Sequence, residues 1–181
     1  MFLFQPICVK DCDRTGKTAL HYCAENTSPD VAQLLLKSDA GLVNQPDEEG
    51  YTPLHLAVIA GNRIMLRYLL DHGAEVNLLD NERHSVVHWA TVCGELEALD
   101  VVLDSGAEAS VEDIHGAYPV HYAAQMCGSN KKTLMSMGGG SGSGGKYTGL
   151  SALKKLISRG VPVDVIDRDG RQPLLWAASS G

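Results

Sequence analysis

Four histidines are the most regularly spaced side chains in this sequence that could bind a metal or act as a base. His21, His55, His88 and His121 follow one another at intervals of 34, 33 and 33 residues. Neutral imidazole is a common zinc ligand, with zinc–nitrogen bonds of about 2.0–2.1 Å. Equivalent positions on stacked helices lie roughly 10 Å apart, which is too far for four rings to share one ion. We therefore predict a structural role for these histidines and no metal site.

The cysteines offer two further possibilities, and neither is supported by its spacing. Cys8 and Cys12 with His21 could form part of a zinc knuckle, but no fourth ligand follows them. Cys93 and Cys127 lie near histidines, as a nucleophile lies near its base, yet no residue that would orient a base accompanies them. The five cysteines are odd in number and form no CxxC pair, which favours a reducing, intracellular compartment, either cytoplasmic or nuclear.

One glycine-containing segment resembles the end of a phosphate-binding loop. Gly16-Lys17-Thr18 has the right order, but Asp11 stands where the first glycine of such a loop is required. We find no catalytic site and no cofactor site in the sequence, and we predict that the chain is not an enzyme. The formal charge of −7 argues against binding to nucleic acid, and the short apolar runs argue against insertion into a membrane.

The histidines belong to a longer repeated phrase, which a search for internal periods finds first. A second phrase, with a glycine followed by a small or branched apolar residue, keeps the same period of about 33 residues. The first phrase occurs as Thr18-Ala19-Leu20-His21, Thr52-Pro53-Leu54-His55, Ser85-Val86-Val87-His88 and Tyr118-Pro119-Val120-His121, and the second as His72-Gly73-Ala74, Ser105-Gly106-Ala107 and Arg159-Gly160-Val161.

These phrases resemble the ankyrin-repeat family, whose repeat of about 33 residues carries the signature T-P-L-H-x-A. Thr52 to Ala57 match this signature fully, and the resemblance runs from about Asp13 to the C-terminus apart from one insertion. It implies an all-α solenoid of helix-turn-helix repeats with β-hairpin or turn fingers. The predicted repeats are residues 13–46, 47–79, 80–112, 113–166 and, in part, 167–181, preceded by an extension or the remnant of another repeat at 1–12.

The second repeat shows why such a unit forms. Gly50 suits a turn, Thr52 can cap the following helix, and Pro53 is tolerated at its first position. A second helix is expected from about Arg63 to Asp71. Its apolar residues are predicted to be buried against the neighbouring repeats, and these residues are Ile64, Leu66, Leu69 and Leu70.

The fourth repeat is longer than the others. His121 lies 54 residues before Leu175, the matching position of the fifth repeat, which places an insertion at about 129–148. Residues 138–145 are all glycine or serine, and such a segment is expected to be flexible. This composition resembles an engineered linker that replaces a longer natural loop, and natural low complexity is the alternative.

The resemblance implies a partner-binding surface on the concave face, formed by the fingers and the inner helices. In the middle repeats the ends of the first helices are apolar where solvent-exposed positions would be polar, which indicates an interaction surface. The alternative is that the aromatic rings only fill space between helices. The predicted contact residues are Tyr51, Ile59, His84, Trp89, Val92, Cys93, His115, Tyr118, Tyr122 and Met126.

The expected function is that of an adaptor or scaffold that binds a protein or peptide, as a monomeric module of a larger protein. Two other hosts fit the same sequence, namely the cytosolic arm of a membrane channel and the regulatory domain of a larger enzyme. The full-length sequence would separate them, because about six apolar segments would indicate a channel and a kinase or ligase signature an enzyme. Fold alone does not distinguish these three, because unrelated functions share one fold.

Overall fold

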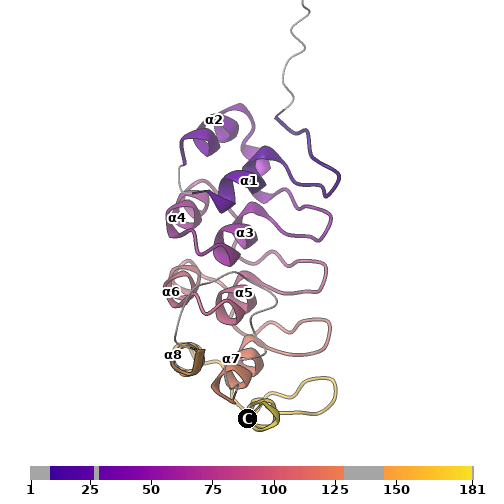
Figure 1. Cartoon of the computed structure of the whole chain (residues 1–181), viewed down its shortest axis with the longest axis vertical. Coiled ribbons are helices and arrows are strands. Elements are labelled where there is room, and N and C mark those ends of the chain that lie inside the picture. The colour runs from indigo at the N-terminus through magenta and orange to yellow at the C-terminus, as the bar shows by residue number, and fades with distance from the viewer. Residues whose placement is uncertain (1–8, 27–28, 129–144, 181) are drawn as a thin grey trace, which may run out of the picture.

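Helices alternate between two rows along the long axis of the computed structural model (Figure 1). The structure describes residues 9–26, 29–128 and 145–180. In these residues no β-strand occurs, and a single isolated bridge joins Cys12 and Thr18, so the predicted all-α solenoid is confirmed. The inner row contains α1 (Ala19–Glu25), α3 (Pro53–Ile59), α5 (Val86–Val92), α7 (Pro119–Gly128) and α9 (Pro173–Ser179), and the outer row contains α2 (Asp30–Ser38), α4 (Arg63–Asp71), α6 (Leu96–Asp104) and α8 (Gly145–Ser158), with a short 3₁₀ helix η1 (Ala40–Asn44) after α2.

A turn precedes each inner helix, and these five turns, the fingers, all project to the same side (Figure 1). The fingers are residues 13–17, 47–51, 80–84, 113–117 and 167–171. Each finger after the first is hydrogen-bonded to the finger before it. The backbone N–H of its second residue donates to the carbonyl of the third residue of that finger at 3.0 Å. The fourth residue of a finger has positive φ, and Gly50 shows why glycine suits the position, since a Cβ there would lie 2.7 Å from the backbone nitrogen of Asn81. The third finger instead has Arg83, at φ 64°.

Helix α3 begins where the capping residues in the sequence predict. The side chain of Thr52 accepts from the backbone N–H of His55 at 3.5 Å, and the imidazole Nδ1 of His55 accepts from the backbone N–H of Thr52 at 3.2 Å. This reciprocal arrangement is a capping box in which histidine replaces the usual glutamate. Pro53 occupies the first helical position as predicted.

The core lies between the two rows and between successive repeats. Leu54, Leu66 and Leu69 are almost fully buried, and each contributes about 1.5–3 kcal/mol to folding. The expectation that Ile64 is buried is wrong, because 59% of it is exposed. The buried face of α4 contains Met65 and Leu69, four residues apart, and Ile64 falls outside that stripe.

The predicted insertion lies mostly outside the described residues. Residues 129–144, with most of the glycine-serine tract, belong to the part that is not described. The expected insertion of 129–148 continues into α8, which begins at Gly145. Its end overlaps the first turn of a helix that packs against α7.

Candidate functional site

The four signature histidines sit near the start of inner helices, and all four are fully buried. The backbone N–H three residues earlier donates to each Nδ1 at 3.0–3.2 Å. Because Nδ1 accepts this bond, the neutral ring carries its proton on Nε2. In three cases Nε2 donates to a backbone carbonyl of the next repeat: His21 to Tyr51 at 3.0 Å, His88 to Ala117 at 3.3 Å and His121 to Arg171 at 3.0 Å.

Burial keeps these rings neutral. It lowers the pKa of all four, to about 4 for His55 and His88. His55 differs in that its Nε2 has no hydrogen-bond partner. A ring bonded on both nitrogens joins one repeat to the next and has no lone pair left for a metal. In the described part of the chain, no group of three or more His, Cys, Asp or Glu side chains could hold a metal ion.

An aspartate at the first position of every finger was missed by the sequence analysis. Its spacing equals that of the histidines, and this shared period is the signal that could have revealed it. Each Oδ1 accepts the backbone N–H groups two and four residues later, at 2.7–3.0 Å, and so closes the finger. The five residues are Asp13, Asp47, Asp80, Asp113 and Asp167.

The other oxygen of the aspartate accepts a hydrogen bond from an aromatic side chain at the position after the signature histidine or, in the fifth repeat, after Leu175. Four repeats have such a residue, and the second has Leu56 instead, which offers no donor. This bond fixes each ring against the base of its finger. The pairs are Tyr22 to Asp13 at 2.5 Å, Trp89 to Asp80 at 3.0 Å, Tyr122 to Asp113 at 2.6 Å and Trp176 to Asp167 at 2.8 Å.

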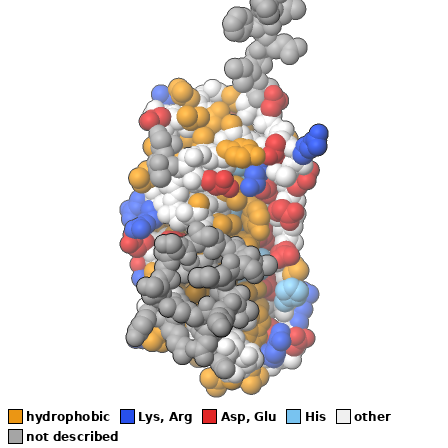
Figure 2. Space-filling view, in the orientation of Figure 1, with side chains coloured by type: hydrophobic (Ala, Val, Ile, Leu, Met, Phe, Trp, Pro, Cys, Tyr) orange, Lys and Arg blue, Asp and Glu red, His pale blue; other side chains and the backbone are white. Residues whose placement is uncertain are grey.

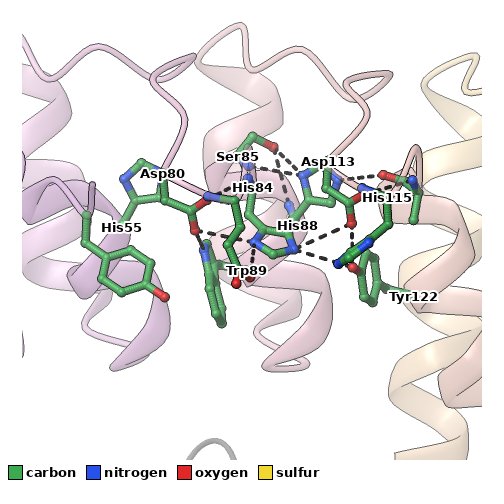
Figure 3. Close-up of polar contacts among 12 residues, drawn as sticks. His55, Asp80, His84, Ser85, His88, Trp89, Asp113, His115 and Tyr122 are labelled. Carbon is green, nitrogen blue, oxygen red and sulfur yellow. Dashed lines mark hydrogen bonds and ion pairs between the residues drawn. The ribbon is translucent and has the colours of Figure 1, made fainter. Parts of the chain in front are cut away.

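His84 lies between the carboxylates of two successive repeats (Figure 3). Its Nδ1 is 3.4 Å from Oδ2 of Asp80, and its Nε2 is 3.6 Å from Oδ2 of Asp113. Burial alone would lower the pKa of His84, but the two carboxylates outweigh it and raise that pKa to about 9. The ring is therefore an imidazolium at neutral pH. His84 was predicted as a partner contact, and the structure also gives it this ionic role.

The His84 ion pairs predict a pH dependence of stability. The folded pKa lies above the ordinary 6.5, so the stabilisation is complete below pH 6.5 and is lost as the pH rises through about 9. We expect the free energy of unfolding, measured by urea titration, to fall between pH 7 and 9.5. His84→Gln should remove the part of this pH-dependent fall in the free energy of unfolding that the His84 ion pairs cause. His115→Gln, at an exposed site, should leave that part unchanged. Equal slopes in the two variants would contradict the ionic role.

We call the surface formed by the fingers and the inner helices the inner face. A row of rings runs along this surface. Figure 2 shows a hydrophobic stripe along the long axis, with acidic side chains along its finger edge. On the inner face, Tyr51 and Trp89 meet edge to face with ring centroids 5.5 Å apart, and Tyr122 and Trp176 do so at 5.4 Å. His84 lies between the two pairs, 5.5 Å from Trp89 and 6.1 Å from Tyr122. We call these five residues the aromatic row.

The other predicted contact residues are more scattered. Ile59 and Val92, the last residues of α3 and α5, are half-buried, as is the adjacent Cys93. His115 is exposed on the fourth finger. Tyr118 precedes α7 and its ring stacks on that of His121, with centroids 6.0 Å apart.

The prediction that Met126 is an exposed contact residue is wrong, because only 7% of it is accessible. Ile59 and Val92 come four residues after their signature histidines, and the same count in the fourth repeat leads to Gln125, which is exposed. Met126 lies one residue further along and so points to a different side of α7. It packs against α8, where Gly149 approaches its Cβ.

A hollow of about 410 Å³ lies at the end of the aromatic row, between α7 and α9. The guanidinium of Arg171 lies 5.4 Å from the ring centroid of Trp176, where Asp167 and Asp169 each hold it at 2.8 Å. The predicted contact residues lie in repeats two to four, so this hollow was not predicted from the sequence. Its lining residues are Gln125, Arg171, Leu175, Trp176 and Ser179.

Three of the described cysteines, Cys23, Cys93 and Cys127, are poorly suited to nucleophilic catalysis. Burial, and then the charge of Glu95, raise the pKa of Cys93 to about 11, and burial raises the pKa of Cys127 and Cys23. The thiolate is the nucleophile, so these thiols are unreactive near neutral pH. No helix in the described residues is long and apolar enough to span a bilayer.

Comparison with known proteins finds similarity over about a third of this chain. The chain is 45% identical over 62 residues to neurogenic locus notch homolog protein 1 of Xenopus tropicalis. It is 46% identical over 61 residues to the BTB/POZ domain and ankyrin repeat-containing protein BOP of Lupinus luteus. It is 37% identical over 67 residues to the nuclear factor NF-kappa-B p105 subunit of Rattus norvegicus. The matches cover 34%, 33% and 36% of this chain but only 2%, 13% and 7% of those proteins. The chain thus spans a small part of the relatives that it matches.

Family models place the repeats more directly. A model of three ankyrin repeats matches residues 37–113, and a model of a single ankyrin repeat matches residues 15–48. These ranges contain His21, His55 and His88 and helices α1 to α6. This chain belongs to the ankyrin-repeat family.

Proposed function

We propose that this chain is an adaptor module that binds a protein or peptide on its inner face. Ankyrin repeats are in general protein–protein interaction modules, and the family is generally non-catalytic. The observation that supports the inner face is the aromatic row, in which buried aspartates hold every ring except that of Tyr51 and the rings still reach the surface. Rings fixed before binding lose little conformational entropy when a partner covers them.

Composition and burial support the same proposal. Aromatic residues and Met or Arg are enriched in interface centres, and the inner face combines the aromatic row with Arg171. Ile59 and Val92 continue its apolar surface toward the ends of the inner helices. The thiol chemistry fits a reducing compartment, and we therefore place the module inside the cell, as a monomeric part of a larger protein.

Charged substitutions on the inner face should weaken partner binding. We expect Ile59→Lys and Val92→Lys each to reduce the affinity for the natural partner, recovered by proximity labelling, at least tenfold, which is about 1.4 kcal/mol. The reason is that a buried, unpaired ammonium is costly at an interface. Titration calorimetry with the purified partner measures the effect.

Ile64→Lys provides a matched control, because Ile64 is exposed on the outer helix α4. It introduces the same change of side chain and should leave the affinity for the natural partner within twofold of that of the unmodified chain. Melting curves of all three variants separate loss of folding from loss of binding. Full affinity in folded Ile59→Lys and Val92→Lys variants would exclude the inner face.

A further inference from the structure

The second and third fingers combine an aromatic surface with a local excess of negative charge. Residues 47–51 and 80–84 contain five carboxylates and two cationic side chains, Arg83 and the imidazolium of His84. The first finger, residues 13–17, contains one carboxylate and two cations, and the fifth, residues 167–171, contains two of each. The excess comes from the second finger, which holds Tyr51 and has three carboxylates and no cation, whereas the third finger has two of each and the fourth, residues 113–117, has one carboxylate.

The environment of Tyr51 shows how close these carboxylates are to the ring. Burial, and then the charges of Asp80, Glu82, Glu49 and Asp47, raise the pKa of the Tyr51 hydroxyl to about 12. The ring itself contacts Trp89 edge to face at 5.5 Å. Two aromatic rings and four carboxylates thus meet in one region of the inner face.

Only two of these four carboxylates are available to a partner. Asp47 and Asp80 are buried and accept hydrogen bonds from their own fingers. Glu49 and Glu82 are exposed, and the carboxylate of Glu82 reaches only His84, at 3.7 Å. A cation that approaches Tyr51 and Trp89 from solvent would therefore meet two exposed carboxylates at the rim, of which Glu82 also faces His84.

We propose that Tyr51, Trp89, Glu49 and Glu82 form a subsite for a lysine or arginine side chain of a basic, extended peptide segment in the partner. This proposal rests on the proposed function of the inner face. Cations are attracted to aromatic faces within about 6 Å of the ring centroid, and carboxylates at the rim add a favourable charge interaction. An acidic segment would be repelled by the same fingers.

Peptide selection tests the subsite with a defined probe. A displayed library of random 12-residue peptides is selected against the whole chain, and the bound peptides are sequenced. We expect enrichment of Lys and Arg over Asp and Glu, next to apolar residues. A selected peptide should bind the Glu49→Gln/Glu82→Gln double variant at least tenfold more weakly, and salt should weaken its binding to the unmodified chain.

The Glu108→Gln/Glu112→Gln double variant is a matched control, because it makes the same charge change at exposed glutamates outside the fingers. It should bind the peptide within twofold of the unmodified chain. Peptides that lose binding in Ile59→Lys and Val92→Lys, yet show no basic enrichment or no response to Glu49→Gln/Glu82→Gln, would overturn the subsite and leave the inner face standing. Peptides that ignore Ile59→Lys and Val92→Lys, or a library without binders, would overturn both.

Discussion

Asp113→Ala is expected to lower the free energy of unfolding by about 3–5 kcal/mol, the range found when one partner of a buried ion pair is removed. The Asp113 side chain is fully buried. Its Oδ1 accepts from the backbone of His115 and Ala117, and its Oδ2 accepts from Tyr122 at 2.6 Å and faces His84. Although burial raises the pKa of Asp113, these partners lower it further, so the carboxylate is charged and tied to all of them. Urea unfolding followed by circular dichroism measures the loss.

Two companion variants separate the contributions at Asp113. Asp113→Asn keeps an acceptor for the finger but removes the charge opposite His84. It should therefore lower the free energy of unfolding by less than Asp113→Ala does. Asp13→Ala removes the same finger and tyrosine bonds in an exposed repeat without such a histidine, and should cost less than Asp113→Ala. If Asp13→Ala and Asp113→Ala cost the same, the account of the His84 ion pairs is wrong.

Gly149→Leu should destabilise the chain by about 1–3 kcal/mol or more, the usual cost of overpacking. Glycine is unfavourable inside a helix, so an open site would gain from this change. At Gly149, however, even a Cβ would lie 2.8 Å from the Cβ of Met126 and 2.9 Å from the backbone nitrogen of Cys127. The close approach of α7 and α8 therefore requires glycine here. Thermal unfolding measures the effect.

Lys154→Leu is the control for this substitution, because Lys154 is exposed on the same helix. The same new side chain there should change stability by no more than about 0.5 kcal/mol. Equal stability of Gly149→Leu and Lys154→Leu would show that α8 does not approach α7 as closely as described.

The repeat architecture was predictable because it depends on periodic signals. Thr52, Pro53 and His55 act within one turn of helix, so their sequence spacing determines their contacts. The same period also contained the aspartates, but their role depends on where an aromatic ring nine residues later points, which sequence spacing alone does not specify.

The candidate site was less predictable, because it depends on exact positions around a helix. Met126 was assigned to the inner face by its apolar character, although one further residue rotates a side chain by about 100° on a helix of 3.6 residues per turn. His84 could be identified as a finger residue, but its charge depends on Asp113, a residue of the next repeat, as well as on Asp80 of its own finger. Contacts between repeats were the part that the sequence pattern could not supply.

The most direct measurement is a two-dimensional proton–nitrogen NMR titration with a peptide selected from the random library. The sequence contains two tryptophans, so two indole signals are expected, and Trp176→Phe assigns them. If the inner face binds partners, the indole signal of Trp89 should shift or broaden on addition of peptide, while the backbone amides of Ile64 and Arg67 on the outer helix α4 remain unchanged. An unchanged Trp89 indole together with shifted α4 amides would contradict the account and place the binding surface on the outer helices.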